Sequence, residues 1–433
     1  MPNLRKLLLF FGDVILLYLS LIIALILDFS KRFSFDTFWL HFLPFTLLYF
    51  FWLIIFYIFG LYDLNLIKKK VSFYSRAIAA FFVCFVAGII FFYGLPSFGI
   101  SPKINLAVNI LLFGLFFFGW RNLFYSLFSS YFQNRLIILG QGPDVENLRR
   151  EVSEKPYIGY KLITISEKED LFSQIQKENI DTVIFTEELE TDPSFLKALY
   201  FCLPARVNFI DFARAYEIIN EKIPVSTISH GWFLENLKEG EKWLYDGFKR
   251  WEDMILSFLL LLITFPLWPF IALAIKLQDG GPIFYKQTRV GKGGKNFLLL
   301  KFRSMVPEAE KEGPQWAKSE DDRVTKFGSF LRRSHLDEIP QMLNILKGDL
   351  SLVGPRPERP EFFGSLQKEI PHYQIRNLIK PGFTGWAQIK FRYGRTVSDQ
   401  KEKFEYDLYY LKNRGVLLDT SILLKTFQLL FIK

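Results

Sequence analysis

Asp337 and Glu338 form an adjacent acidic pair that follows Arg332 and Arg333 by about one helical turn and precedes an apolar segment. Pro340 is tolerated in the first turn of a helix, so the sequence predicts that both carboxylates lie at or just before a helix N-terminus. The helix dipole favours an ionised carboxylate there, which suits a nucleophile. It suits a helix cap equally well, and capping is the commoner use of an acidic residue at this position. The spacing alone leaves both roles open.

Fixed positive charges near the acidic pair indicate a site for phosphate. The proline-framed loop Gly354–Pro357 would hold Arg356 in one place, and guanidinium groups bind phosphate oxygens in a bidentate manner. Lys301 and Arg303 flank an aromatic residue, so in an extended segment both cations would share one face. The segment Asp279–Lys295 is rich in glycine, whose backbone can approach a phosphate closely. Its spacing differs from that of a P-loop and also fits two hairpin turns.

The composition places this chemistry at a membrane. Of the 433 residues 50% are hydrophobic, with 49 Phe, 19 Tyr and 9 Trp, which is too apolar for an ordinary soluble chain. The net charge of +9 is modest, and Lys and Arg cluster beside apolar segments. This favours anionic lipid or phosphate-bearing partners and no nucleic acid. Cys84 and Cys202 predict neither a disulfide nor a thiolate metal site, and His335 and His372 lack the spacing of zinc ligands.

Four apolar segments predict a four-helix transmembrane unit over residues 1–132, because each approaches the roughly 20 residues that cross a bilayer. These segments cover residues 7–28, 38–60, 76–95 and 105–128. Lys and Arg flank the unit before the first segment, between the second and third, and around the end of the fourth. Both ends of the unit are therefore expected to face the cytoplasm. Asp13 and Asp28 fall near the ends of the first segment, which favours a location at the membrane surface over a functional one.

Residues 133–242 have the pattern of a Rossmann-like α/β accessory domain. An apolar strand at 135–139 runs into Gly140-Gln141-Gly142 before a polar helix at 145–152. The other predicted strands cover residues 160–165, 182–185 and 207–210. Val145 stands where the dinucleotide fingerprint requires a third small residue, so a structural or regulatory role is favoured over nucleotide binding.

Residues 243–433 begin with an apolar segment at about 252–277 that Pro266 and Pro269 interrupt. Each proline removes a helix hydrogen bond and can bend the axis. A complete crossing would carry the cations of residues 286–303 to the outside, against the positive-inside rule. We therefore expect a re-entrant helix that breaks at Pro266 and has both ends on the cytoplasmic face. A kinked span is the alternative that the prolines alone permit.

Four stretches of this last part closely resemble the bacterial polyprenyl-phosphate hexose-1-phosphate transferases, known as the bacterial sugar transferase family. They are Asp279–Phe302, Arg332–Pro357, Lys380–Gln388 and Tyr406–Tyr410. The preceding four-helix unit and α/β domain are similar to those of the long-form members, which initiate exopolysaccharide or O-antigen synthesis. The resemblance implies a membrane α-helical bundle, a Rossmann-like domain and an α/β catalytic domain with a re-entrant helix. It also implies a multi-pass protein of the bacterial cytoplasmic (inner) membrane whose catalytic domain faces the cytoplasm.

The reaction implied by the resemblance is a Mg²⁺-dependent transfer of hexose 1-phosphate from a UDP-sugar to undecaprenyl phosphate. Its products are undecaprenyl-diphosphate-sugar and UMP. By motif position Asp337 corresponds to the nucleophile that forms an aspartyl phosphosugar, and Glu338 to its partner. Either carboxylate is a candidate Mg²⁺ ligand, and the sequence does not say which one holds the metal. A carboxylate nucleophile divides one difficult displacement into two easier ones.

Five further positions match family residues associated with substrate or phosphate, namely Lys301, Arg332, Arg356, Arg392 and Asp419. Arg392 follows Lys390-Phe391 where the family has Asn-Gly, so its loop can hold the arginine differently. The role of Asp419 is open between substrate contact and structural support.

Two other functions stay open from the residues alone. One is a catalytically silent assembly or regulatory protein of polysaccharide machinery. The other is a nicotinamide-dependent enzyme, which rests on Gly140 and Gly142 only. The motifs do not identify the hexose, the polyprenyl length or the oligomeric state, and a homo-oligomer is possible.

Overall fold

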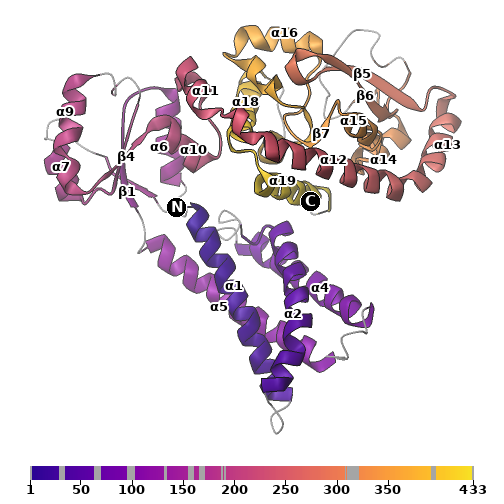
Figure 1. Ribbon diagram of the computed structural model, residues 1–433, viewed down its shortest axis with the longest axis horizontal. Coiled ribbons are helices and arrows are strands. Elements are labelled where there is room, and N and C mark those ends of the chain that lie inside the picture. The colour runs from indigo at the N-terminus through magenta and orange to yellow at the C-terminus, as the bar shows by residue number, and fades with distance from the viewer. Residues whose placement is uncertain are drawn as a thin grey trace. The chain divides into compact units, whose positions relative to one another are not determined.

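The computed structural model describes residues 2–28, 35–62, 70–94, 103–130, 134–154, 160–164, 171–186, 189, 192–307, 309, 321–391 and 396–431. The chain divides into two compact units, Met1–Ile219 and Asn220–Lys433 (Figure 1). The second unit therefore includes residues 220–242, which the sequence pattern groups with the α/β domain. Arg392 lies outside the described residues.

Four long helices form the apolar part of the first unit, and each begins slightly earlier than predicted. They are α1 (Pro2–Asp28), α2 (Phe35–Ile58), α4 (Lys70–Gly94) and α5 (Lys103–Ser130). Helix α1 packs along α5, and α2 packs along α4. Aromatic side chains such as Trp52, Phe56 and Phe117 fill the interior. By length and composition, all four helices could cross a membrane.

A buried ion pair links the first and last of these helices. Arg121 on α5 donates two hydrogen bonds, of 2.7 and 3.1 Å, to the two carboxylate oxygens of Asp13 on α1. Asp13 is fully buried. This pair connects the two helices, so Asp13 lies inside the helical unit with a structural partner, which its position near the end of the first segment did not predict.

The rest of the first unit contains a parallel sheet with helices on both faces. The strands β1 (Asn134–Leu139), β2 (Tyr160–Leu162), β3 (Thr182–Phe185) and β4 (Asn208–Asp211) lie in the order β2-β1-β3-β4. Side chains alternate along β1, so Leu136 and Ile138 pack toward α6 (Pro143–Glu154) and α10 (Phe212–Asn220). Ile137 packs instead toward α7 (Leu171–Glu178) and α9 (Pro193–Phe201).

The conformation and packing of the turn after β1 explain why one of its two glycines, Gly140, cannot be another residue. Gly140 has φ +123°, and a Cβ there would lie 2.4 Å from the Thr186 side chain. Only glycine satisfies both demands, since other residues rarely adopt such a φ and none would fit beside Thr186. Close packing between β1 and the end of β3 therefore accounts for Gly140 without a bound nucleotide.

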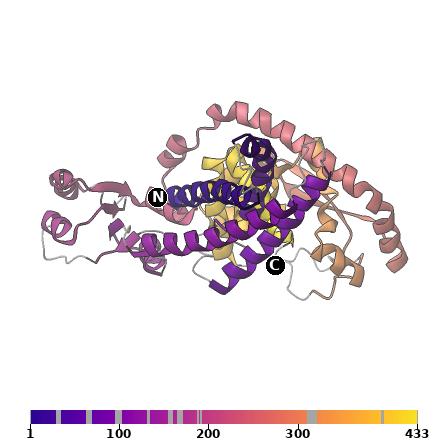
Figure 2. The ribbon, with the colours of Figure 1, turned by 90° about the horizontal axis from the view of Figure 1, so that it is seen from below.

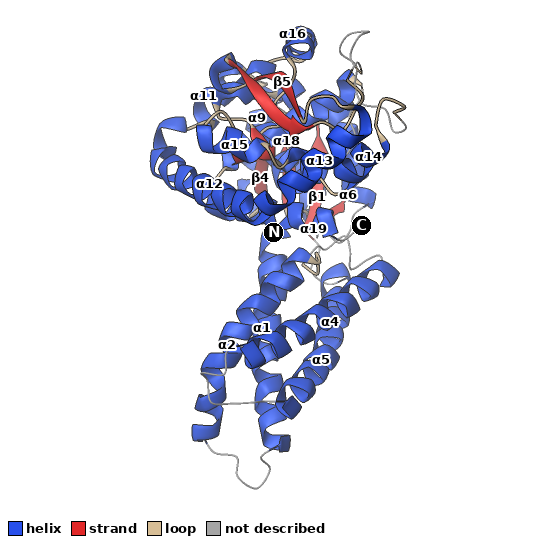
Figure 3. Ribbon diagram, turned by 90° about the vertical axis from the view of Figure 1, so that its right-hand side faces the viewer, coloured by secondary structure: helices blue, strands red, loops and turns tan. Residues whose placement is uncertain are grey.

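The described part of the second unit is mostly helical, with two small two-stranded sheets (Figure 3). Strands β5 (Phe284–Val290) and β6 (Asn296–Phe302) form an antiparallel hairpin, while β7 (Ser351–Val353) and β8 (Gly382–Thr384) pair in parallel. Its α-helices are α11 (His230–Asn236), α12 (Trp243–Thr264), α13 (Trp268–Asp279), α14 (Lys326–Arg333), α15 (Gln341–Lys347), α16 (Pro360–Glu369), α17 (Trp386–Lys390), α18 (Val397–Asn413) and α19 (Val416–Phe431).

Helices α12 and α13 are separated by a 3₁₀ turn, Phe265–Leu267, which contains Pro266, where the sequence predicts a break. The two helices form one long bent element (Figure 2). The segment that contains them is the fifth in the described chain that is long and apolar enough to cross a membrane. Large apolar side chains stay exposed along both helices, among them Trp251, Phe258, Ile263 and Phe270.

The core of the second unit comes from residues distant in sequence. Met342 and Ile345 of α15 pack with Leu352 of β7 and with Tyr410 and Leu411 of α18. Helix α15 is thereby anchored to the middle of the unit. Thr325 caps α14 by accepting a hydrogen bond from the Gly328 amide at 2.9 Å, which fixes where that helix begins.

Candidate active site

Asp337 and Glu338 lie in a single 3₁₀ turn, Leu336–Glu338, between α14 and α15. His335 immediately before it has φ +54°, a left-handed conformation that ends the preceding helix sharply. Pro340 then precedes the first residue of α15. The acidic pair therefore stands just before a helix N-terminus, as the proline pattern predicts. Helix α15 has seven residues, so its dipole contributes little on its own.

Two cations bind Glu338 directly. Its Oε1 accepts a hydrogen bond from Lys301 Nζ at 2.5 Å and another from Arg356 Nη2 at 2.9 Å. Burial alone would raise the pKa of Glu338, but the charges of Lys301 and Arg356 outweigh it and hold that pKa well below its usual range. Glu338 is consequently an ionised carboxylate that fixes two cations in place.

Asp337 has the opposite environment. It is 7% exposed, and within the described residues it makes no hydrogen bond or ion pair. Burial, followed by the negative charge of Glu338, raises the pKa of Asp337 to about 6, although Lys301 and Arg332 lower it in part. Glu338 is thus bound to cations, while the carboxylate oxygens of Asp337 are available to bind another group.

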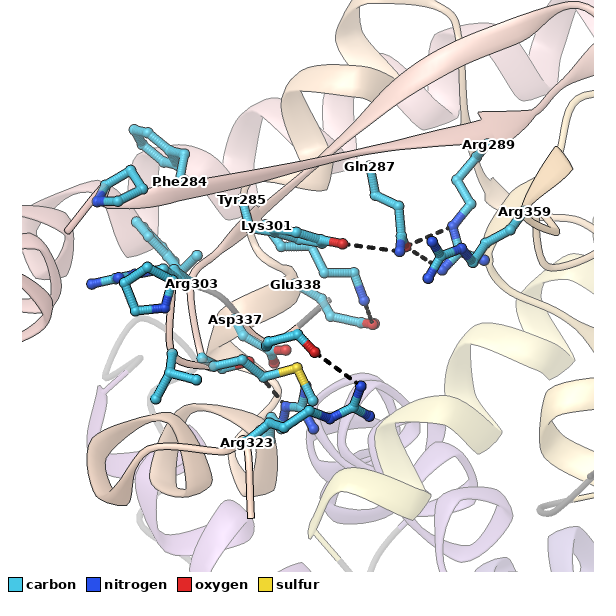
Figure 4. A pocket seen from close by; sticks show the side chains of 18 of the residues that line it. Phe284, Tyr285, Gln287, Arg289, Lys301, Arg303, Arg323, Asp337, Glu338 and Arg359 are labelled. Carbon is cyan, nitrogen blue, oxygen red and sulfur yellow. Dashed lines mark hydrogen bonds and ion pairs between the residues drawn. The ribbon is translucent and has the colours of Figure 1, made fainter. Parts of the chain in front are cut away.

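Both carboxylates line a pocket of about 500 Å³, a volume within the range of small-molecule sites (Figure 4). Cationic side chains outnumber acidic ones among the lining residues. The cations are Arg289, Lys301, Arg303, Arg323, Arg332, Arg356 and Arg359, and the acids are Asp337, Glu338 and Glu358. Such a pocket attracts a ligand that carries several negative charges.

The structure brings most of the predicted site residues together. Lys301, Arg332 and Arg356 line the same pocket as the acidic pair. Arg332 reaches it from the last turn of α14, where its Nε donates a hydrogen bond to Ser304 Oγ at 2.9 Å. Lys301 stands near the end of β6, and the next residue, Phe302, is buried, as the extended pattern predicts.

Asp419 is not among the residues that line this pocket. It is 1% exposed, and it accepts hydrogen bonds from Tyr245 Oη at 2.7 Å, Tyr410 Oη at 2.8 Å and Lys249 Nζ at 2.5 Å. These contacts tie α12, α18 and α19 together. Of the two roles that the sequence left open for Asp419, this environment favours structural support.

Several pocket residues were not singled out from the sequence. Tyr285, Gln287 and Arg289 alternate along β5 and form a row, in which Gln287 Nε2 donates to Tyr285 Oη at 3.0 Å and Arg289 Nε donates to Gln287 Oε1 at 3.0 Å. Alternate residues of a strand point to the same face, so the occurrence of these three polar residues at every second position could have predicted that they share a face. The sequence contains no local pattern that would have identified Arg323 and Arg359, because only the fold brings them to the pocket.

Hydrogen bonds from two other arginines hold the loop that carries Arg356 in place. Arg376, which is buried, donates a hydrogen bond to the Arg356 carbonyl at 2.9 Å and forms an ion pair with Asp407 at 2.8 Å. Arg289 donates to the Pro357 carbonyl at 2.9 Å. Asp407 belongs to the stretch Tyr406–Tyr410, so this motif supports the site from a distance.

Comparison with known proteins agrees with this geometry. Residues 244–433 match the family model described as bacterial sugar transferase. The chain is 41% identical over 185 residues to the UDP-N-acetylgalactosamine-undecaprenyl-phosphate N-acetylgalactosaminephosphotransferase of Aeromonas hydrophila, covering 43% of this chain and 44% of that protein. It is 42% identical over 181 residues to the UDP-glucose:undecaprenyl-phosphate glucose-1-phosphate transferase of Xanthomonas campestris pv. campestris, covering 41% of this chain and 37% of that protein.

A shorter relative is covered more completely. The putative undecaprenyl-phosphate N-acetylgalactosaminyl 1-phosphate transferase of Bacillus subtilis (strain 168) is 48% identical over 132 residues, which is 30% of this chain and 74% of that protein. The matches to the Aeromonas and Xanthomonas proteins, in contrast, span less than half of each relative's length.

Proposed function

This chain belongs to the bacterial sugar transferase family, and we propose that it transfers a sugar 1-phosphate from a UDP-sugar to undecaprenyl phosphate. The observation that carries the proposal is the division of roles within one acidic pair. Glu338 is ionised and bound to two cations, whereas the oxygens of Asp337 have no hydrogen-bond partner among the described residues. A cation-rich pocket with one available carboxylate suits phosphoryl transfer through a covalent intermediate.

In the first proposed step an Asp337 oxygen attacks the β-phosphorus of the UDP-sugar. The bond from that phosphorus to the bridging oxygen breaks, and its electron pair leaves with UMP. The product is an acyl phosphate that joins Asp337 to the sugar 1-phosphate. Lys301 and Arg356, held by Glu338, lie where they can offset the negative charge that develops on the phosphate oxygens.

In the second step an oxygen of undecaprenyl phosphate attacks the same phosphorus. The bond to Asp337 breaks, the carboxylate is restored, and undecaprenyl-diphosphate-sugar leaves. Both steps bring negative groups together, so the surplus of cations in the pocket is a requirement of this chemistry.

Mg²⁺ is the proposed cofactor. No group of three or more His, Cys, Asp or Glu among the described residues is arranged to hold a metal by itself. Mg²⁺ commonly binds one or two carboxylates together with substrate phosphates, and the available oxygens of Asp337 fit that use. When bound, Mg²⁺ would neutralise phosphate charge. Glu338 is the weaker candidate ligand because its Oε1 already accepts from Lys301 and Arg356.

We propose that α12 and α13 form a re-entrant membrane helix with both ends on the cytoplasmic side. The bend at Pro266 and the exposed apolar side chains on both helices support this course. So does the cationic catalytic pocket, whose residues follow directly after α13 and would otherwise lie outside. A cytoplasmic catalytic unit would also have access to UDP-sugars.

For the parallel sheet of the first unit we propose a Rossmann-like accessory role without a nucleotide. The strand order β2-β1-β3-β4 is typical of doubly wound folds. The packing of Gly140 against Thr186 supports a structural reason for the glycine turn.

The proposal is tested by UMP release from the purified full-length chain in nanodiscs. The assay contains Mg²⁺, undecaprenyl phosphate, and in turn UDP-glucose and UDP-N-acetylgalactosamine, the donors named for the two relatives above. We expect release with one donor that depends on the lipid phosphate and falls at least about 10³-fold in Asp337→Asn. Folded protein that releases no UMP with a broad donor panel would favour the silent assembly role instead.

A further inference from the structure

A second, smaller pocket of about 100 Å³ lies in the same unit and shares no lining residue with the first. Helix α12, the turn of the β5–β6 hairpin and the segment before β8 contribute to it. Five cations line it, Lys249, Arg250, Lys292, Lys380 and Arg414, against two carboxylates, Asp246 and Asp253. Positive charge is therefore the main property of this pocket, as it is of the first one.

The nearby carboxylates are already bound to other groups. Arg414 forms ion pairs with Asp246 and with Glu239. Asp253 Oδ1 accepts a hydrogen bond from the Leu352 amide at 3.0 Å. Lys249 is paired with the buried Asp419. These contacts account for two of the five cations.

The other three cations have no carboxylate partner within the described part of the chain. Arg250 donates hydrogen bonds to the carbonyls of Ile345 and Leu346, at 2.6 and 2.7 Å, and so caps the end of α15. Lys292 and Lys380 make no hydrogen bond or ion pair with described residues. Three positive charges without a carboxylate partner among the described residues consequently share one small pocket, which Asp246 and Asp253 also line.

Two of these charges approach the same point beside the end of α15. A Cβ on Gly348 would lie 3.5 Å from Lys380 Nζ and 3.6 Å from Arg250 Nη2, so both groups approach one point. Burial, followed by the charge of Arg250, lowers the pKa of Lys380; Asp253 and Asp349 oppose this shift, and Lys292 adds to it. Positive groups that face one small pocket repel one another, and a bound anion would offset that repulsion.

We propose that this pocket binds a phosphate group, as a monoester or a diester, between Lys292, Lys380 and Arg250. Ammonium and guanidinium groups are the side chains that bind phosphate oxygens. The site is distinct from the catalytic pocket. The acidic pair precedes α15, whereas Arg250 binds the last carbonyls of that helix, about 10 Å away along its axis.

The phosphate can belong to a lipid headgroup or to a soluble compound. Lys249, Arg250 and Asp253 point into the pocket from one face of α12, and Trp243, Phe248 and Trp251 are exposed on the same helix. Aromatic side chains of this kind prefer the headgroup level of a membrane, which brings lipid phosphates within reach of the pocket. The experiment below separates the two sources.

The test compares the wild-type full-length chain with Lys292→Gln/Lys380→Gln and with Lys295→Gln. Lys295 is an exposed lysine of the same hairpin turn that does not line the pocket, so it is a matched control for lost charge. Arg250 is left intact because it caps α15. Thermal unfolding in a zwitterionic detergent is followed by tryptophan fluorescence while short-chain phosphatidic acid or inorganic phosphate is added.

We expect phosphatidic acid to stabilise the wild type and Lys295→Gln at similar concentrations. The double variant should require at least about tenfold more. If inorganic phosphate gives the same pattern, the group is recognised without acyl chains, and if only phosphatidic acid does, the source is the lipid. Equal titration midpoints in wild type and double variant would mean that phosphate acts elsewhere, such as at the catalytic pocket, and would overturn the proposal.

A double variant that does not fold would be replaced by Lys292→Gln alone. Lys292 is exposed and has no described partner, so its loss should leave the fold unchanged. The midpoint should still rise at least about threefold in that variant, and an unchanged midpoint would count against the site.

Discussion

Lys301 Nζ lies 2.5 Å from Glu338 Oε1, so this cation is bound to the acid beside the proposed nucleophile. Arg356 shares the same oxygen at 2.9 Å. Glu338 thereby brings together two side chains from elements far apart in the sequence, β6 and the loop after β7. The acidic pair acts as one unit, in which one member organises the cations and the other is available to react.

Replacing Lys301 by Met should lower the rate of UMP release by on the order of 10²-fold, because it removes a cation of the proposed phosphate site and a hydrogen-bond partner of Glu338. Lys301→Arg should recover part of the rate, since it keeps the charge. Lys286→Met on the neighbouring strand β5 is the control, because Lys286 is exposed and does not line the pocket. An equal loss in both Met variants would point to a general charge effect.

Replacing Arg376 by Met should lower the free energy of unfolding by about 3 to 5 kcal/mol, because it leaves Asp407 buried without its partner. It should also lower kcat, since the Arg356 carbonyl loses its hydrogen bond. Denaturant unfolding and UMP release measure the two effects. Arg333→Met on the exposed side of α14 should change neither. An unaltered kcat in a folded Arg376→Met variant would show that the hydrogen bond from Arg376 to the Arg356 carbonyl does not affect catalysis.

The rate should depend on pH through Asp337. A nucleophilic carboxylate must be ionised, and the pKa of Asp337 is raised to about 6, so kcat/KM should fall as the pH drops below about 6. Bound Mg²⁺ favours the ionised form and should move the midpoint downward. A pH profile at several Mg²⁺ concentrations measures both trends. A rate that stays constant down to about pH 5 at limiting Mg²⁺ would contradict the environment described for Asp337.

Removal of Mg²⁺ should abolish UMP release and leave thermal stability almost unchanged when no substrate is present. No described cluster of carboxylates and histidines is arranged to hold the ion alone, so Mg²⁺ should arrive with the phosphates. Unfolding curves with and without EDTA test this. A large drop in melting temperature on chelation would indicate a resident structural metal.

The elements that could be predicted are those that follow from local pattern. Continuous apolar runs predicted the four long helices of the first unit, and the strand candidates predicted β1 to β4, with β2 shorter than expected and β4 shifted by one residue. Adjacency in the chain was enough to find the acidic pair, and Pro340 was enough to place it before α15. Each of these depends on neighbours within one or two turns.

Other features of the site depend on contacts that no local pattern contains. Arg323 and Arg359 reach the pocket only through the fold, and the pair of Arg376 with Asp407 joins positions 31 residues apart. The pKa values of Asp337 and Glu338 shift in opposite directions because burial and the charge of Glu338 dominate at Asp337, whereas Lys301 and Arg356 hydrogen-bond directly to Glu338. The contacts of Asp419 with α12 and α18 could not be foreseen for the same reason.

The covalent role of Asp337 is tested most directly by labelling the protein in the absence of lipid acceptor. The full-length chain in nanodiscs without undecaprenyl phosphate is mixed with Mg²⁺ and a UDP-sugar that carries a radioactive β-phosphorus. We predict about one equivalent of acid-stable, hydroxylamine-sensitive label on the wild type, located at Asp337, and its discharge when undecaprenyl phosphate is added. Full activity with no label on the protein, or label that persists in Asp337→Asn, would contradict the proposed intermediate.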